Sequence, residues 1–264
     1  PAEGQLRHAD VAGRVGTAGA VFDTADTKLR LANWTMARTE NDRYQFDIPA
    51  DTFTIRLEAI PLQTPVLRGN QGFSSKGPSP ELASYYYSRP QLNVTAQIEI
   101  KDKLSKGKQS SLLKRSGIAW FDHEWSSSLL MPGAVGWDWI GINLLNGESI
   151  MAFRIRDQSG KALFSEWDRR DQTGRILERH SNAIWESVGQ WSSARSLANY
   201  PSGFFIRIGN QEFQLKTLMQ DQEVDARGST GGFYYEGAVE MSQNQVVIGR
   251  GYLELTGYSK AVRL

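Results

Sequence analysis

Residues 117–139 read GIAWFDHEWSSSLLMPGAVGWDW and hold four of the eight tryptophans of the chain and one of its three histidines. Within this stretch the polar triplet Asp122, His123 and Glu124 lies between aromatic residues, with Trp125 directly after it. Buried polar groups require hydrogen-bond partners. The triplet is therefore either a hydrogen-bonded network between two apolar layers or the polar end of a ligand pocket.

Alternation of apolar and polar residues on both sides of this stretch predicts β-strands. Residues 52–60, for example, place Phe53, Ile55 and Leu57 on one face, as a half-buried strand requires. No amphipathic helix longer than three turns is evident, and a proline-rich loop is expected at residues 61–80. The other expected strands are residues 28–34, 43–48, 84–89, 92–100, 117–123, 136–144, 149–156, 161–168, 175–180, 183–188, 204–208, 212–218, 232–241 and 245–258. The sequence therefore predicts an all-β protein with antiparallel hairpins.

Short motifs recur in the same order in both halves of the chain. WTMAR at 34–38 matches WSSAR at 191–195, and YYY at 85–87 matches FYY at 233–235. Two weaker matches follow the same order, and together they favour a duplication. We therefore expect two domains, residues 1–127 and residues 128–264. Only the second copy has a tryptophan-rich opening hairpin, so the first domain is expected to lack its opening strands.

Composition excludes several classes of function. The 264 residues are 40% hydrophobic and 22% charged, which is typical of a soluble globular protein. The net charge of +1 gives no electrostatic attraction to nucleic acid. The basic run KDKLSKGK at 101–108 is short and interrupted, and we interpret it as a solvated hairpin turn. The chain opens with Pro1 and not with Met, so we expect a segment to precede it.

The sequence gives no sign of a metal or a cofactor. It contains no cysteine, and its histidines are scattered, so disulfides, thiolate catalysis and a zinc site are not expected. We find no phosphate-binding loop, no dinucleotide fingerprint and no Gly-x-Ser-x-Gly elbow.

An ordered set of motifs resembles the AttH-like and carotenoid 1,2-hydratase-like proteins. They are SYYYSRPQLNVTAQIEI at 84–100, AWFDHEWSS at 119–127, GWDWIGINL at 136–144, MAFRIRD at 151–157 and GRGYLELTGY at 249–258. The resemblance is close from residue 84 onward and looser before it. It implies two tandem lipocalin-like antiparallel β-barrels joined near residues 127–135, and an extracytoplasmic (periplasmic or secreted) location. In this family the hydratases add water across a terminal isoprenoid double bond without a cofactor, and related fungal proteins act as cyclases.

Hydration of an alkene by acid catalysis requires a proton donor near a dry, aromatic pocket. Strand alternation places Asp122 and Glu124 on one face and His123 on the other, so we expect one of these faces to point inward. The His-x-Trp pattern of the hydratases is matched by His123 and Trp125, and the resemblance places both in the active site. The hydratases also use a Tyr-x-Asp pair on the following strand, which residues 149–154 lack. This departure counts against carotenoid hydration and leaves Asp138 or Glu124 as a substitute acid.

The candidate catalytic residues are therefore Asp122, His123 and Glu124. The candidate ligand-binding residues are Trp120, Trp125, Trp137, Asp138, Trp139, Tyr86 and Phe153. Each has an alternative structural role, in a polar network for the triplet and in core packing for the aromatic residues.

Three functions follow as hypotheses. The first is binding of a small apolar ligand, isoprenoid-like or lipid-like, at the junction of two barrels. The second is a cofactor-independent hydratase, isomerase or cyclase. The third is a structural partner of a membrane transport complex, with both barrels filled by side chains.

Overall fold

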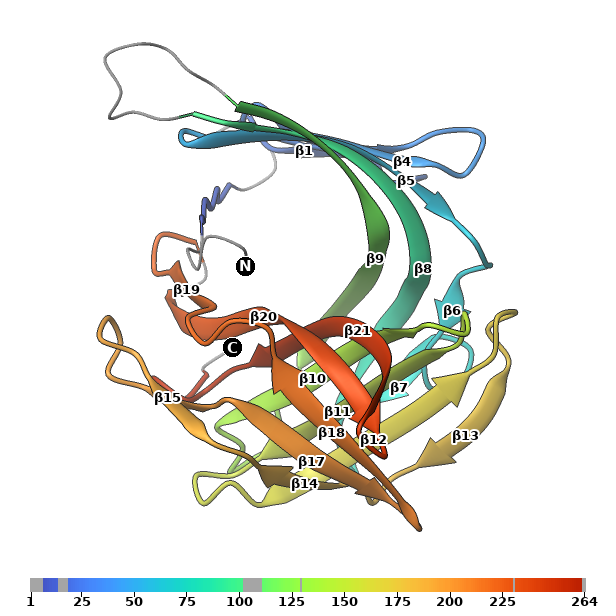
Figure 1. The fold of residues 1–264 in the computed structure, drawn as a ribbon, viewed down its shortest axis with the longest axis vertical. Coiled ribbons are helices and arrows are strands. Elements are labelled where there is room, and N and C mark those ends of the chain that lie inside the picture. Colours follow the sequence, from blue (N-terminus) through green and yellow to red (C-terminus); the bar gives the residue numbers. More distant parts are fainter. Residues whose placement is uncertain (1–6, 14–18, 102–110, 129, 230, 263–264) are drawn as a thin grey trace.

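The computed structural model describes residues 7–13, 19–101, 111–128, 130–229 and 231–262. Within these ranges every regular element is a β-strand, and the strands pair antiparallel, so the all-β prediction is confirmed (Figure 1). No helix in the described ranges has the length and apolar character needed to cross a membrane.

The first sheet runs in the order β1-β2-β3-β4-β5-β8-β6, and β7 and β9 also pair with β8. Its strands are β1 (Val21–Phe22), β2 (Lys28–Leu31), β3 (Trp34–Arg38), β4 (Tyr44–Pro49), β5 (Phe53–Pro61), β6 (Val66–Leu67), β7 (Phe73–Ser75), β8 (Ala83–Ile100) and β9 (Ser111–Ser128). The strands β6 and β7 lie within the segment that was predicted to be a loop.

The long hairpin of β8 and β9 connects the first sheet to the rest of the molecule, and both strands curve toward the second sheet (Figure 1). Two separate strands were predicted where β8 is continuous, because a bulge between Arg89 and Leu92 interrupts the alternation. Gln91 in this bulge has a positive φ of 54°. The predicted basic turn at 101–108 lies, beyond Lys101, outside the described residues.

The second sheet runs in the order β13-β12-β11-β10-β21-β20-β18-β17-β14, with β19 paired to β20, and β15 pairs with β16 separately. Its strands, and that pair, are β10 (Gly136–Leu144), β11 (Ser149–Arg156), β12 (Ala162–Arg170), β13 (Ile176–His180), β14 (Ile184–Ser187), β15 (Gln190–Ser192), β16 (Asn199–Pro201), β17 (Gly203–Ile208), β18 (Gln211–Thr217), β19 (Glu223–Ala226), β20 (Gly232–Gln243) and β21 (Val246–Leu255).

The second sheet curls around on itself (Figure 1). Its own side chains form the core that it encloses. Alternate residues of each strand point inward, such as Ile140 and Ile142 of β10 and Leu253 of β21, and all three are fully buried. Trp167 of β12 stacks on Phe213 of β18, with ring centroids 5.2 Å apart, across this interior. The interior of the second sheet is therefore filled, and the opposite residues of β10 and β21 face outward toward the first sheet.

Each sheet draws its strands from one of the two predicted halves of the chain. The domain boundary at 127/128, the duplication and the closure of either sheet into a complete barrel stay predictions.

Candidate functional site

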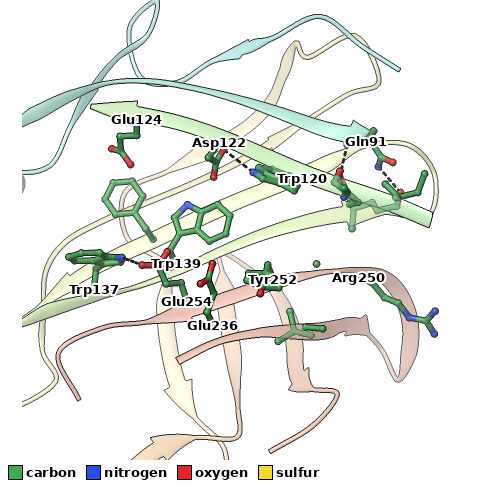
Figure 2. A pocket seen from close by; sticks show the side chains of 18 of the residues that line it. Gln91, Trp120, Asp122, Glu124, Trp137, Trp139, Glu236, Arg250, Tyr252 and Glu254 are labelled. Atoms are coloured by element: carbon green, nitrogen blue, oxygen red, sulfur yellow. Dashed lines mark hydrogen bonds between the residues drawn. The ribbon is translucent and has the colours of Figure 1, made fainter. Parts of the chain in front are cut away.

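A cavity of about 1240 Å³ lies between β9 of the first sheet and the outer face of the second sheet (Figure 2). Its aromatic walls come from Trp120 of β9, Trp137 and Trp139 of β10, Tyr86 of β8 and Phe153 of β11. On β10 the two indole rings alternate with core residues, so the period-two geometry of the strand directs them into the cavity. These five aromatic residues were all predicted to bind ligand, and the structure brings them together.

The carboxyl group of Asp122 is held by donors on the first-sheet side of the cavity. Trp120 Nε1 donates a hydrogen bond to its Oδ1 at 2.8 Å, and the Tyr86 hydroxyl donates to its Oδ2 at 2.9 Å. Trp139 Nε1 in turn lies 3.1 Å from the Tyr86 hydroxyl oxygen, to which it donates. Burial raises the pKa of Asp122 and raises that of Tyr86 well above its usual value. Hydrogen bonds thus connect Trp120 of the first sheet to Trp139 of the second sheet. The connection runs through the Asp122 carboxyl group and the Tyr86 hydroxyl.

Glu124 lines the cavity on the same face of β9 and is paired with a cation. Its Oε1 lies 2.8 Å from Lys76 Nζ and also accepts a hydrogen bond from the Ser84 hydroxyl. The same ammonium group lies 4.3 Å from the ring centroid of Phe153, so the lysine is held between a carboxylate and an aromatic face.

The opposite wall carries two glutamates that the sequence analysis missed. Glu236 of β20 and Glu254 of β21 are direct cross-strand partners, and both line the cavity (Figure 2). Trp137 Nε1 donates a hydrogen bond to Glu254 Oε1 at 3.0 Å. Burial, together with the nearby Glu236, raises the pKa of Glu254 to about 8. The signal in the sequence is the alternation in GYLELTGY, which places Tyr252 and Glu254 on the face opposite Leu253 and Leu255.

His123 and Trp125, which the resemblance places in the active site, lie outside this cavity, on the face of β9 opposite Asp122 and Glu124. Both are exposed, and Trp125 retains 52% of its surface. The centroid of the His123 ring lies 5.0 Å from that of the Trp125 ring and 5.3 Å from that of the Tyr87 ring. The reason is strand alternation, since neighbouring residues of β9 point to opposite faces and only the face of Asp122 meets the second sheet.

Asp138, a predicted ligand-binding residue, lies away from the cavity, inside the second sheet. It is fully buried and accepts hydrogen bonds from Arg154 Nε at 2.6 Å and Arg156 Nε at 2.9 Å. The Tyr258 hydroxyl donates a third at 3.1 Å. The guanidinium groups of Arg154 and Arg156 neutralise the Asp138 carboxylate, and it does not reach the cavity. Asp138 is therefore not a substitute acid there.

Behind the Trp120 wall, a buried ion pair joins the two sheets. Arg68 is fully buried, and its Nη1 lies 2.7 Å from Asp168 Oδ1 of β12. The same guanidinium donates to the Ser88 hydroxyl at 2.8 Å and lies 5.4 Å from the Trp120 ring centroid. At the other end of the cavity, the side chain of Gln91 donates to the backbone oxygens of Leu144 and Glu148. Among the described residues, no group of three or more histidine, aspartate or glutamate side chains is arranged to hold a metal ion.

The fold and the cavity define an all-β protein with a ligand-sized space between two antiparallel sheets. Residues 1–258 match the profile of the AttH-like family, and the chain belongs to that family. A solved structure from Nitrosomonas europaea that carries the AttH name shares 39% identity and a TM-score of 0.80, and the match covers 88% of this chain and 69% of that one. The resemblance inferred from the sequence motifs is therefore confirmed.

More distant structures share the fold alone. Kievitone hydratase from Nectria haematococca is 15% identical with a TM-score of 0.66, over 89% of this chain and 71% of that chain. CghA, solved with Sch210972, is 13% identical with a TM-score of 0.52, over 89% of this chain and 72% of that chain. No curated protein matches the chain.

Proposed function

We propose that this protein binds a small, mainly apolar ligand in the cavity between its two sheets. The observation that carries the proposal is a space of about 1240 Å³ walled by Trp120, Trp137 and Trp139, with a few hydrogen-bonded carboxyl groups. This volume lies somewhat above the range of about 300–1,000 Å³ that is typical of ligand pockets, and the cavity shares their combination of apolar walls with a small number of fixed polar groups. The wall is pre-arranged, because the indole nitrogens of all three tryptophans are already hydrogen-bonded.

Structures of the same fold are compatible with this proposal. One is named as a hydratase and another was solved with the small molecule Sch210972. These names describe those proteins, and for this chain they support only a search for a small organic ligand.

Tryptophan fluorescence and native mass spectrometry test the proposal. Titration with farnesol, an isoprenoid alcohol, should give saturable binding, and Trp139→Leu should weaken it about tenfold by removing an apolar wall, in line with roughly 25 cal/mol per Å² of buried surface. The matched control is Trp125→Leu, which removes an indole from the opposite face of β9 and should leave the affinity unchanged. The proposal fails if farnesol does not bind, or if only Trp125→Leu weakens binding.

A second function, cofactor-independent acid–base chemistry, is favoured by the pKa of Glu254, which burial raises to about 8. A carboxyl group that keeps its proton at neutral pH can donate it to an alkene carbon, and water then adds to the resulting cation and releases a proton. Nearby aromatic faces stabilise such a cation. Glu254→Gln and Asp122→Asn should abolish turnover of a bound alkene while leaving it bound, and turnover retained in both variants would exclude this chemistry.

A further inference from the structure

The two glutamates on the second-sheet wall lie side by side in a place where a charge is costly. Glu236 and Glu254 are register partners on β20 and β21, and directly opposed residues of an antiparallel pair have Cβ atoms about 4.5–5.5 Å apart. Both side chains reach the cavity, beneath the indole ring of Trp139 (Figure 2). Like charges in this arrangement destabilise each other unless a proton or a cation intervenes.

The groups that surround this pair are mostly acidic or neutral. From the same sheet, Tyr234 donates a hydrogen bond to Glu236, Trp137 donates to Glu254, and Tyr252 lies on the strand of Glu254. Across the cavity, Asp122 and Glu124 on β9 add further negative charge near Glu254.

The cationic side chains near Glu236 and Glu254 do not neutralise the charge of these two glutamates. Lys76 is already paired with Glu124, and the charge of His8 in the N-terminal segment acts on Glu236 more weakly than burial, which raises the pKa of that glutamate. Arg250, at the rim of the cavity, forms its ion pair with Glu240 and points away from the two glutamates (Figure 2). Within the described part of the chain, no lysine or arginine forms an ion pair with Glu236 or Glu254.

Aromatic rings complete the surroundings of the pair. Trp137 and Trp139 stand over the glutamates, and Phe153 and Tyr86 continue the apolar wall. Ring faces attract cations, and the attraction strengthens when the cation is removed from water. Carboxyl groups beside indole faces are therefore suited to a positively charged group attached to an apolar body.

We infer that the ligand of this cavity carries a protonated amine, which Glu236 and Glu254 hold while its apolar body packs against Trp137 and Trp139. The inference rests on the proposed function, since it names the ligand class of the same cavity. An ammonium group has three donors, so it can bond to both carboxyl groups and still direct a third hydrogen bond across the cavity. It also supplies the counter-charge that the protein lacks at this place.

Matched ligands with one chain length separate this inference from simple apolar binding. Isothermal titration calorimetry at pH 8.5 would compare decylamine, decanol and decanoate below their micelle concentrations. Decylamine should bind at least tenfold more tightly than decanol, and decanoate more weakly than either because carboxylates repel it. In the variant Glu236→Gln/Glu254→Gln, decylamine should lose about tenfold in affinity while decanol keeps its own. Glu212→Gln, on the exposed surface of β18, is the control and should change nothing.

The pH dependence gives an independent readout on the unmodified protein. Because the pKa of Glu254 is raised to about 8, the carboxylate that receives the ammonium forms as pH rises through this range. Decylamine affinity should therefore increase from pH 6 to pH 9, while decanol affinity stays flat.

The outcomes are distinguishable. If none of the three ligands binds, the proposed function fails. If decanol or decanoate binds as tightly as decylamine, or the double variant keeps the preference for the amine, the cavity binds apolar ligands and the amine inference alone is overturned. The comparison of decylamine with decanol remains decisive even if the double variant does not fold.

Discussion

Two sets of buried charges at the junction of the sheets differ in one respect, the presence of a partner. Asp168 accepts hydrogen bonds from Arg68 and Arg170, whereas Glu254 faces Glu236 without a cation among the described residues. Burial alone would raise the pKa of Asp168, but the two guanidinium groups outweigh it and hold that pKa below its usual value. For Glu254, burial and the second glutamate act together and raise the pKa to about 8.

The difference separates a buried carboxylate whose charge is compensated within the protein from a pair whose charge is not. A carboxylate between two guanidinium groups is satisfied and ties β12 to the segment after β6. Glu236 and Glu254 accept hydrogen bonds from Tyr234 and Trp137, but their negative charge is balanced only by a proton or by a cation that enters the cavity. The same residue chemistry, at similar depth, therefore has a different charge balance because of its neighbours.

The largest effect on stability is expected when Asp168, the carboxylate paired with two arginines, loses its charge. Asp168→Asn leaves Arg68 and Arg170 buried without a counter-charge, and we expect the free energy of unfolding to fall by about 3–5 kcal/mol. Urea denaturation at pH 7 measures it. Glu212→Gln, which breaks an exposed ion pair with Arg207, should cost less than about 1 kcal/mol. Equal losses in the two variants would show that the buried pair does not hold the sheets together.

The stability contributed by Glu254 should fall as pH rises, whereas that contributed by Asp168 should fall as pH drops. Between pH about 4.5 and about 8 the folded protein keeps a proton on Glu254 that the unfolded chain has released, so stability falls as pH rises through this window. The contribution is on the order of a few kcal/mol. Glu254→Gln should flatten the decline and be more stable than the unmodified protein at pH 9, as followed by urea midpoints from pH 5 to 9.

Asp168 provides the contrast, because its lowered pKa gives stability that is lost only as pH falls below about 4, the ordinary range of an aspartate. An unchanged slope in Glu254→Gln between pH 5 and pH 9 would mean that this glutamate is not the group that titrates.

The smallest effect concerns the uncharged contact at the other end of the cavity. Gln91→Ala removes two hydrogen bonds to backbone oxygens of the second sheet and should cost about 1–3 kcal/mol. Gln91→Gly loses the same bonds but relieves the positive φ of 54°, so it should cost about 1 kcal/mol less than the alanine variant. Thermal unfolding of both variants measures the order, and a glycine variant that is less stable than the alanine variant would contradict it.

Local sequence patterns determined the class of fold and much of the cavity wall. Alternation alone predicted an all-β chain, and it assigned Asp122 and Glu124 to one face of β9 and His123 to the other. The motifs also led to the AttH-like family and to five aromatic residues that line the cavity. The extracytoplasmic location and a transport partner remain predictions.

Tertiary structure decided which of those faces lines the cavity. Period-two alternation is a property of each strand, so it separates the two faces without saying which one meets another sheet. The position of His123 outside the cavity depends on the packing of β9 against the second sheet, a contact between segments far apart in the chain, whereas Asp138 inside the second sheet and Glu236 beside Glu254 depend on the pairing of neighbouring strands. The curvature of β8 and β9 and the register of β20 on β21 set these contacts, and alternation within a single strand does not encode them.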